Sequence, residues 1–351
     1  MDYAQLAQKV KEFSLALGFI EAKIASCDLP EEKIHHIQNW LDQGFYGQMA
    51  YLKRHGTERT HASYVLPQAK SIILVAMPYW PETLSQSEHL LNTPEQAYIS
   101  RYALGRDYHK VLRSKLKQLG QFLEQEQSDV IYRGIVDSAP LAEVAFASLA
   151  GLGWTGKNSL LLQKNAGSLF FLGALITNLP LPFDQPIKEH CGTCNRCMQS
   201  CPTGAIISPY IVDATRCLSY LTIESPKLID VPYRKAMGNR IYGCDDCQLV
   251  CPFNRFAQNN QQTDFKPRHG LDQVSLLSLL NWSETEFKEK MAGSPIYRIG
   301  YNKWQSNILI ALGNAPTHSH IILALQNFLN QDNDPMCQEA ALWALAQHQT
   351  P

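Results

Sequence analysis

The sequence predicts an α+β protein built of three successive parts, and three observations support this division. Apolar runs alternate with amphipathic stretches through residues 1–180. Eight of the ten cysteines fall within residues 187–256, inside a second part that we place at residues 181–260. Residues 261–351 then repeat apolar side chains at spacings of three and four, which is typical of packed helices.

The first part is expected to be an α/β domain. Helical spacing fills residues 1–60, whereas short apolar runs rich in β-branched residues indicate buried strands farther along. The strand candidates are Ser71–Tyr79, Val130–Val136 and Ser168–Thr177, and the helix candidates between them are residues 106–126 and Leu141–Ala150. Strands separated by helices indicate an α/β or α+β domain.

Two proline-rich or polar stretches mark the boundaries of the cysteine-rich part. Residues 179–186 (LPLPFDQP) precede it, and residues 257–270 (AQNNQQTDFKPRHG) follow it as a polar linker. Beyond the linker, the helical patterns at residues 307–312, 321–329 and 338–346 suggest a helical-repeat end of the HEAT kind.

The composition narrows the class of protein. The chain has 351 residues, 45% of them hydrophobic, with 31 Lys and Arg against 32 Asp and Glu. A net charge of -1 argues against a globally basic coat for nucleic acid. The N-terminus lacks a signal-peptide pattern and no apolar run is long enough for a membrane span, so a cytoplasmic protein without a membrane partner is expected. No coiled-coil heptads occur, and a monomer is expected.

The cysteine spacing is the most specific signal. One run has the form C-x2-C-x2-C-x3-C-P from Cys191, and a second reads C-x2-C-x3-C-P from Cys244. Such runs hold two [4Fe–4S] clusters in ferredoxin-like modules, in which the last cysteine of each run binds the other cluster. Cys217 stands alone between the runs and takes the place of the first cysteine of a regular second motif. One cluster is therefore assigned Cys191, Cys194, Cys197 and Cys251, and the other Cys201, Cys217, Cys244 and Cys247.

Other uses of these cysteines fit less well. Two zinc sites would use separate C-x2-C pairs, and disulfides are rare in a reducing compartment. The remaining residues, Cys27 and Cys337, have no partner motif and are expected to be buried or free thiols of unknown role.

Two further motifs are incomplete. Residues 151–156 match the dinucleotide fingerprint G-x-G-x-x-G, but helix-forming residues precede them where a strand is needed. A tight turn is preferred, although residues 157–159 could cradle a phosphate or an amide-rich ligand. Asp107–His109 begins like the D-x-H-x-x-G motif of cobalamin-ligating folds, but Leu112 replaces the glycine, so no axial histidine is inferred.

Asp137 ends the apolar stretch before Pro140 and admits two roles. Apolar neighbours could raise the pKa of this carboxyl and make it a proton donor. Alternatively Asp137, or equally Ser138, could cap a helix that starts at Pro140. The residues alone leave these alternatives even.

Several stretches together resemble the epoxyqueuosine reductase family over nearly the whole chain. Besides the two cysteine runs, they are Arg101–His109 (RYALGRDYH), Val136–Glu143 (VDSAPLAE), Gly151–Asn158 (GLGWTGKN) and Gly238–Cys247 (GNRIYGCDDC). The resemblance implies an oxidoreductase that uses cobalamin and two [4Fe–4S] clusters to reduce epoxyqueuosine to queuosine in tRNA with GUN anticodons. A low-potential electron donor is implied as a further partner.

The resemblance also implies roles for particular residues, with Asp137 as the proton donor. The predicted cobalamin contacts are Arg59, Ser100, Asp137, Lys157, Asn158, Leu161, Gly173 and Asp245. The predicted tRNA contacts are Arg234, Lys235, Arg240, Arg298 and Lys303, although each of them taken singly fits a solvated surface better.

Two other functions compete with this one. A cobalamin-dependent enzyme of the reductive dehalogenase kind would share both cofactors, but the chain lacks its twin-arginine export signal and carries an extra helical end. A non-catalytic two-cluster electron carrier would explain the cysteines and leave most of the chain without a role.

Overall fold

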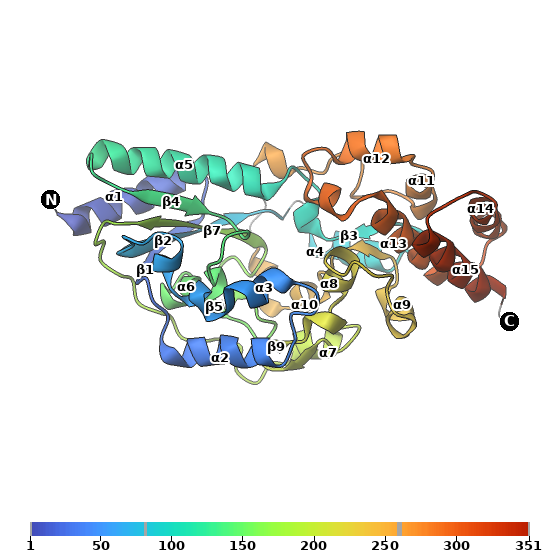
Figure 1. The fold of residues 1–351 in the computed structure, drawn as a ribbon, viewed down its shortest axis with the longest axis horizontal. Coiled ribbons are helices and arrows are strands. Elements are labelled where there is room, and N and C mark those ends of the chain that lie inside the picture. The colour runs from blue at the N-terminus through green and yellow to red at the C-terminus, as the bar shows by residue number, and fades with distance from the viewer. Residues whose placement is uncertain (1, 81–82, 258–261, 350–351) are drawn as a thin grey trace.

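The computed structural model describes residues 2–80, 83–257 and 262–349, which form a mixed α and β architecture with a helical C-terminal end (Figure 1). This arrangement confirms the predicted α+β class. The strands are β1 (Glu21–Ala25), β2 (Ser71–Pro78), β3 (Tyr98–Ile99), β4 (Tyr132–Ile135), β5 (Trp154–Thr155), β6 (Leu161–Leu162), β7 (Phe170–Thr177), β8 (Ile206–Ser208), β9 (Ile211–Val212) and β10 (Arg240–Tyr242). The helices are α1 (Tyr3–Ala16), α2 (Glu31–Asp42), α3 (Ala50–His55), α4 (Leu84–Leu91), α5 (Tyr108–Glu126), α6 (Glu143–Leu149), α7 (Arg196–Ser200), α8 (Leu218–Ile223), α9 (Val231–Met237), α10 (Asp246–Leu249), α11 (Leu276–Leu280), α12 (Glu284–Met291), α13 (Tyr301–Asn314), α14 (Ser319–Leu329) and α15 (Pro335–Gln349).

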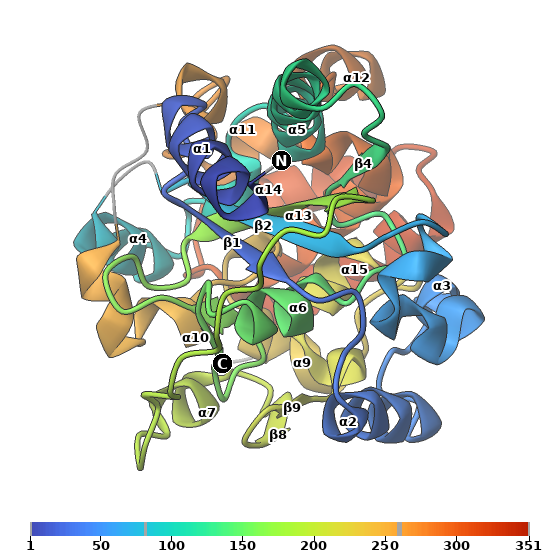
Figure 2. The same ribbon diagram turned by 90° about the vertical axis from the view of Figure 1, so that its left-hand side faces the viewer.

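A four-stranded sheet in the order β1-β2-β7-β4 forms the centre of the N-terminal part. Successive side chains of a strand point to opposite faces, and β2 is buried on both. Its Ile73, Val75 and Met77 belong to the core beneath α1 and α5. Its Ile72, Leu74 and Ala76 belong to the core on the side of α6. The sheet is therefore sandwiched between helices, as Figure 2 shows.

Two features of this sheet differ from the sequence prediction. Residues 1–60 are not all helical, because β1 occupies Glu21–Ala25 and pairs with β2. All three pairings in the sheet are antiparallel, so this part is α+β rather than a parallel α/β unit. Alternating helices and strands are compatible with either strand direction, so their order along the chain could not decide it.

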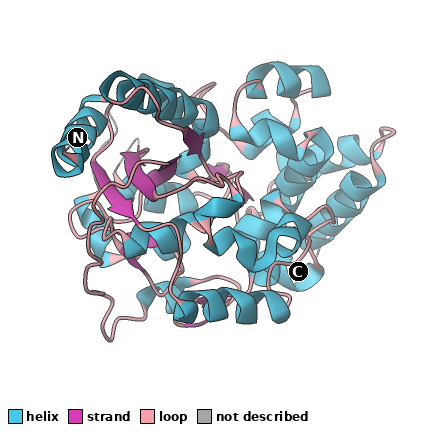
Figure 3. Cartoon of the chain, turned by 60° about the vertical axis from the view of Figure 1, so that its left-hand side comes forward, coloured by secondary structure: helices cyan, strands magenta, loops and turns pink. Residues whose placement is uncertain are grey.

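The three strand candidates and both helix candidates are confirmed as β2, β4, β7, α5 and α6. The predicted C-terminal helices are confirmed as α13, α14 and α15, which pack together and leave that end without strands among its described residues (Figure 3). Part of the predicted polar linker, residues 258–261, lies outside the described residues. No helix in the described ranges is long and apolar enough to cross a membrane.

The packing crosses the sequence divisions. Ala97, Ile99 and Leu104 belong to the core formed with α8, α9 and the C-terminal helices, not to the cores of the four-stranded sheet. Correspondingly, β3 pairs in parallel with β10 from the cysteine-rich part. This pairing brings residues 98–101 against the second cysteine run, where Ser100 and Tyr98 contact Asp245.

Candidate active site

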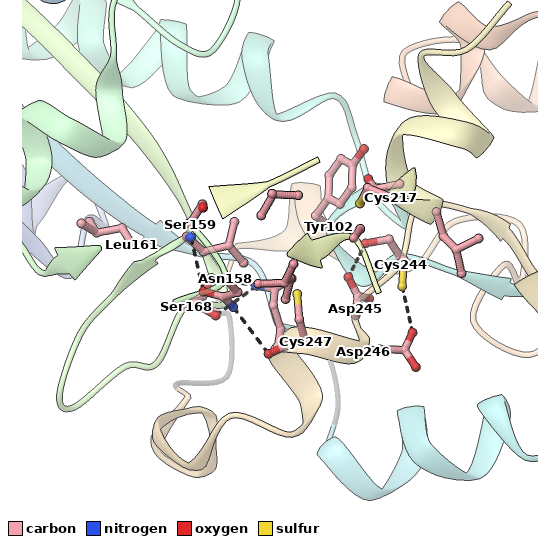
Figure 4. A pocket seen from close by; sticks show the side chains of 18 of the residues that line it. Tyr102, Asn158, Ser159, Leu161, Ser168, Cys217, Cys244, Asp245, Asp246 and Cys247 are labelled. Atoms are coloured by element: carbon pink, nitrogen blue, oxygen red, sulfur yellow. Dashed lines mark hydrogen bonds between the residues drawn. The ribbon is translucent and has the colours of Figure 1, made fainter. Parts of the chain in front are cut away.

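A cavity of about 540 Å³ lies where the sheet, the segment 158–161 and the cysteine-rich part meet (Figure 4). Phe170 and Leu172 line it from the beginning of β7, and Asp137 lines it from the loop after β4. Four cysteines line it from the other side, namely Cys201, Cys217, Cys244 and Cys247. These are the four residues that the spacing assigned to one cluster.

The other four predicted ligands surround a second cavity of about 170 Å³. Its lining includes Cys191, Cys194, Cys197 and Cys251. The last cysteine of each run thus lies with the other run's group, as the crossed arrangement requires. Asn158 lines both cavities and therefore lies between the two groups of thiols.

The thiol arrangement suits clusters better than single ions. Within the described residues, no three His, Cys, Asp or Glu side chains converge closely enough to hold one metal ion. A zinc ion needs four ligands at bonding distance from one point. In a cubane each thiolate binds a different iron, so the four sulfur atoms stand apart around a cage, as the two cavity linings permit.

Asp137 is held in place by polar contacts with three residues, Tyr108, His109 and Glu143. The Tyr108 hydroxyl donates to its Oδ2 at 2.5 Å, and the His109 Nε2 lies 3.4 Å from the same oxygen. Its backbone N–H donates to the Glu143 carboxyl oxygens at 3.1 and 3.0 Å. The φ angle of Asp137 is +55°, a left-handed conformation that non-glycine residues seldom adopt and that is common at functional sites.

His109 joins Asp137 to a second carboxylate. Its Nδ1 lies 2.8 Å from Asp107 Oδ1, while its Nε2 faces Asp137. Asp107 also accepts the His109 backbone N–H at 3.0 Å and thereby caps α5. The D-Y-H tripeptide that resembled an incomplete cobalt-ligand motif is therefore the source of two side chains that contact Asp137.

The charges of this cluster are set by its hydrogen bonds. Burial acts to lower the pKa of His109, but the bonds to Asp107 and Asp137 outweigh it and raise that pKa to about 9. Burial and the negative charge of Asp137 raise the pKa of Glu143 to about 8. Partial desolvation acts to raise the pKa of Asp137, but bonds from His109 and Tyr108 lower it below its ordinary value. At neutral pH the protons therefore reside on His109 and Glu143.

Two expectations for Asp137 are corrected by this geometry. Its pKa is lowered rather than raised, because hydrogen-bond donors surround its Oδ2 and stabilise the charged form. It does not cap a helix from Pro140 either, and nor does Ser138, because α6 begins at Glu143 after Ala142 without a side-chain cap. Asp137 points into the cavity instead, with 64% of its side-chain surface exposed.

An aromatic wall supports this cluster. The Tyr108 ring stacks on Phe171 with centroids 4.3 Å apart and an angle of 5° between planes, and on His109 at 4.1 Å. Tyr102 meets Tyr108 edge to face at 6.0 Å. Each such contact contributes about 0.5–1.5 kcal/mol beyond burial. The stacking fixes the Tyr108 hydroxyl toward Asp137.

Five predicted cofactor-binding residues lie in the larger cavity: Asp137, Asn158, Leu161, Ser100 and Asp245. Asp245 is buried and accepts hydrogen bonds from Ser100 Oγ at 2.5 Å, Tyr98 Oη at 2.9 Å and Arg101 N at 2.9 Å. It therefore joins the second cysteine run to β3 as well as lining the cavity.

Three other predicted cofactor-binding residues lie elsewhere. Lys157 lines the smaller cavity, where its Nζ donates to the carbonyls of Gly192 at 2.6 Å and Cys194 at 3.0 Å. Gly173 faces α5, and a Cβ there would meet Leu116 Cδ1 at 3.3 Å. Arg59 lies close enough to Glu143 and Asp137 to feel their charges, and its buried Nε has no partner among the described residues.

The five predicted tRNA contacts differ in accessibility. Arg234 is 3% exposed and pairs with Glu339 at 2.8 Å, and Lys303 is 6% exposed with its Nζ on the Lys227 carbonyl. Arg240 forms two bonds to Asp246. Only Lys235 and Arg298 of the five are exposed, and Arg298 pairs with Glu224.

Tyr108, His109 and Glu143 were not identified as functional from the sequence. All three lie in stretches that carried the family resemblance, Arg101–His109 and Val136–Glu143. Polar residues at the start of α5, directly before a run of core positions, were the available signal. Their convergence on Asp137 depends on tertiary packing between α5 and β4.

The fold and site define a class: an oxidoreductase in which two groups of cysteines stand in series beside a cavity with an acid–base cluster. Family models and relatives agree with it. A model described as "Epoxyqueuosine reductase QueG, DUF1730" matches residues 59–138, and one described as "4Fe-4S double cluster binding domain" matches residues 190–254. The epoxyqueuosine reductase of Vibrio cholerae is 49% identical over 98% of this chain and 92% of its own, and that of Escherichia coli K12 is 48% identical over 99% and 90%. This chain belongs to the epoxyqueuosine reductase family.

Solved structures give the same picture of the fold. An epoxyqueuosine reductase bound to a tRNA-Tyr epoxyqueuosine-modified stem loop is 29% identical, with a TM-score of 0.88 over 99% of this chain and 91% of that one. Another, from Bacillus subtilis, is described as having its catalytic aspartate loop swung out of the active site, at 29% identity and a TM-score of 0.89 over the same shares. The chain is thus an oxidoreductase with a double [4Fe–4S] domain.

Proposed function

We propose that this enzyme reduces epoxyqueuosine to queuosine at the wobble position of tRNA with GUN anticodons, using cobalamin supplied with electrons by two [4Fe–4S] clusters. The observation that carries the proposal is the shared cavity: it places four cluster-type cysteines and the Asp137 network around one space. We also propose that residues 1–180 supply the cofactor and acid–base side, 181–260 the clusters, and 261–351 the tRNA side, in a cytoplasmic monomer.

The lining of the larger cavity suits a corrin. The cavity volume of about 540 Å³ falls within the range of cofactor sites. Leucine and phenylalanine side chains form much of the wall, and the polar groups include neutral hydroxyls and amides of Ser159, Ser168 and Gln248. Such groups match a ring that is apolar on its faces and carries neutral amides at its rim. The unpartnered Nε of Arg59 offers one further donor nearby.

The chain's own residues orient the acid–base group and supply protons to the substrate. Conversion of an epoxide to an alkene consumes two electrons and two protons and releases water. Cobalamin, when bound, supplies the cobalt centre that delivers electrons to the substrate carbon. His109 holds a proton 3.4 Å from Asp137 Oδ2, so Asp137 can receive it and pass it to the departing oxygen. The Tyr108 hydroxyl keeps Asp137 pointed into the cavity.

The assignment of His109 as the proton source predicts how the single-turnover rate depends on pH. A group with a raised pKa keeps its proton until the pH passes that pKa, so His109 is charged below about pH 9. We expect the single-turnover rate to be flat near neutral pH and to fall above about pH 8 to 9. His109→Gln should lower the neutral rate about 10- to 100-fold and remove the upper limb assigned to His109.

The control for this measurement is His55→Gln, a histidine outside the cavity lining that contacts Tyr64. It should leave both rate and profile unchanged. A His109→Gln enzyme that keeps the wild-type rate and the same upper limb would exclude the relay.

The tRNA surface is proposed from the exposed members of the predicted set. Lys235 lies over the Trp343 ring at 5.6 Å. Arg298 has 52% of its side-chain surface exposed and lies near Tyr242 and the cavity-lining Tyr102. We therefore assign phosphate contacts to these two, while Arg234 and Lys303 serve packing. The net charge of -1 gives the chain as a whole no attraction for phosphates, so affinity should be modest and strongly dependent on salt.

Substitution of either residue should reduce the salt dependence of tRNA binding by a measurable amount. Lys235→Gln and Arg298→Gln should each lower affinity and reduce the slope of log K against log salt by about 1, measured by fluorescence anisotropy. Lys117→Gln, on the outer face of α5, is the control. Affinity that does not change with salt would contradict the phosphate contacts.

The proposed activity is tested by anaerobic purification with cobalamin supplied, followed by metal analysis and an assay on epoxyqueuosine-containing tRNA. About eight irons and one cobalt per chain, with conversion to queuosine, are expected. Iron without cobalt and without conversion would overturn the proposal and leave an electron carrier as the better account.

A further inference from the structure

The two cysteine groups occupy different positions relative to the active site. The group of Cys201 lines the cavity that contains Asp137, whereas the group of Cys191 lines only the smaller one. The loop around the smaller cavity is exposed at Gly192, Thr193 and Asn195. Electrons that are transferred to the active site must therefore arrive at the Cys191 group. They then move inward past Asn158, which lines both cavities.

The protein surface around the smaller cavity carries unpaired positive charge. Lys188, Arg196 and Arg255 are exposed, and none of them forms an ion pair with any carboxylate in the described part of the chain. Arg196 lines the cavity itself, and the other two lie two residues from its lining residues His190 and Phe253. We call Lys188, Arg196, Arg255, Ile187 and Phe256 the donor-docking surface.

Of the two carboxylates in the same segments, one is ion-paired elsewhere. Asp184 bonds Lys11 Nζ at 2.7 Å and the Ile24 backbone N–H at 2.8 Å. Glu189 is exposed and accepts a hydrogen bond from the Tyr210 side chain, a neutral donor that does not cancel the carboxylate charge. Three positive side chains therefore face solvent against one exposed carboxylate of these segments, although the whole chain has a net charge of only -1.

Exposed apolar side chains accompany these cations. Ile187 is 44% exposed and Phe256 is 46% exposed, and the Arg255 guanidinium lies 4.5 Å from the centroid of the Phe256 ring. A few apolar side chains among like charges are typical of transient electron-transfer interfaces, which are small and rely on charge for fast encounter.

We propose that the donor-docking surface binds a small acidic electron-transfer protein, which reduces the cluster assigned to Cys191, Cys194, Cys197 and Cys251; this inference rests on the proposed function. Each encounter moves one electron: the donor is oxidised, the cluster is reduced, and no bond or proton changes hands. Two encounters supply the two electrons that one epoxide consumes.

An anionic protein fits this surface better than the phosphates of tRNA. The modified base must reach Asp137, which lines the larger cavity and not the smaller one. A donor must instead approach the Cys191 group, because electron transfer requires closeness to a cluster and not to the substrate. The cations surround that group.

The test compares two electron donors by stopped-flow absorption of the oxidised clusters under anaerobic conditions. One donor is a reduced plant-type [2Fe–2S] ferredoxin, which is acidic and of low potential, and the other is reduced methyl viologen, a small cation. The variant is Lys188→Glu combined with Arg255→Glu, since Arg196 stands between two ligands. Iron content is measured first, to establish that both clusters are present.

For the wild-type enzyme the ferredoxin rate should fall as salt is added. The double variant should react with ferredoxin about tenfold more slowly at low salt and lose most of the salt dependence, while its methyl viologen rate is not lowered and rises at low salt, because that donor is a cation. Lys117→Glu on α5, across the molecule from α7 in Figure 1, is the matched control and should behave as wild type.

Three results would overturn the docking proposal: an unchanged ferredoxin rate, equal slowing with both donors, or weakened tRNA binding in place of slowed transfer. The proposed function is judged separately. If methyl viologen reduces the clusters but no queuosine forms in the cobalamin-loaded enzyme, the function fails while the docking surface can still be measured.

Discussion

Asp137→Asn is expected to lower the rate of epoxide reduction by about 10²- to 10⁴-fold while cobalamin and tRNA still bind. The amide of asparagine cannot carry the proton that Asp137 receives from His109 and passes to the departing oxygen. Asparagine tolerates the left-handed backbone found at this position, where φ is +55°, so the loop should keep its conformation. The measurement is single-turnover conversion of modified tRNA, together with the absorption spectrum of the bound corrin.

Two comparisons separate chemistry from structure in this experiment. Asp107→Asn removes the carboxylate on the far side of His109, 2.8 Å from Nδ1, and should give a smaller loss because Asp137 itself remains. Asp137→Ala should lose activity to a similar degree and also some stability, because the hydrogen bond from Tyr108 is lost. An Asp137→Asn enzyme of near wild-type rate would remove this residue from the mechanism.

The elements of the fold were predictable where hydrophobic patterns were long. β2 and β7 are buried on both faces, and α5 repeats buried leucines at helical spacing, so their patterns identified them. β1 was missed because its five residues (EAKIA) include two charged ones and favour a helix by propensity. Its pairing with β2, a tertiary contact, overrides that preference.

The site residues likewise fall into those that a local sequence pattern could predict and those whose role depends on tertiary contacts. Cysteine spacing is a local pattern that indicates cluster binding. Each predicted group of four cysteines lines its own cavity. The role of Lys157 could not be read from the glycine-rich stretch, since its direction depends on the loop at Gly192, 35 residues away. Burial of Arg234 and Lys303 likewise follows from helix packing, which composition does not reveal.

Cys217→Ala is expected to remove one cluster and lower iron from about eight to about four atoms per chain. Cys217 stands alone between the two runs, yet it lines the larger cavity with Cys201, Cys244 and Cys247. Without its thiolate one iron of that cluster loses its protein ligand. Turnover should fall below detection because electrons can no longer reach the active-site cavity. Iron analysis and electron paramagnetic resonance of the reduced protein measure the loss.

Pairs of substitutions then test the crossed assignment. Cys201→Ala added to Cys217→Ala should remove no further iron, since both residues line one cavity, whereas Cys251→Ala added to Cys217→Ala should remove nearly all of it. Cys27→Ala and Cys337→Ala are the matched controls, because neither residue lines either cavity, and both should retain about eight irons. If Cys201→Ala and Cys251→Ala exchanged these behaviours, each run would hold its own last cysteine and the crossing would be wrong. The electron path past Asn158 would then have to be redrawn, since it depends on which thiolates face the active-site cavity.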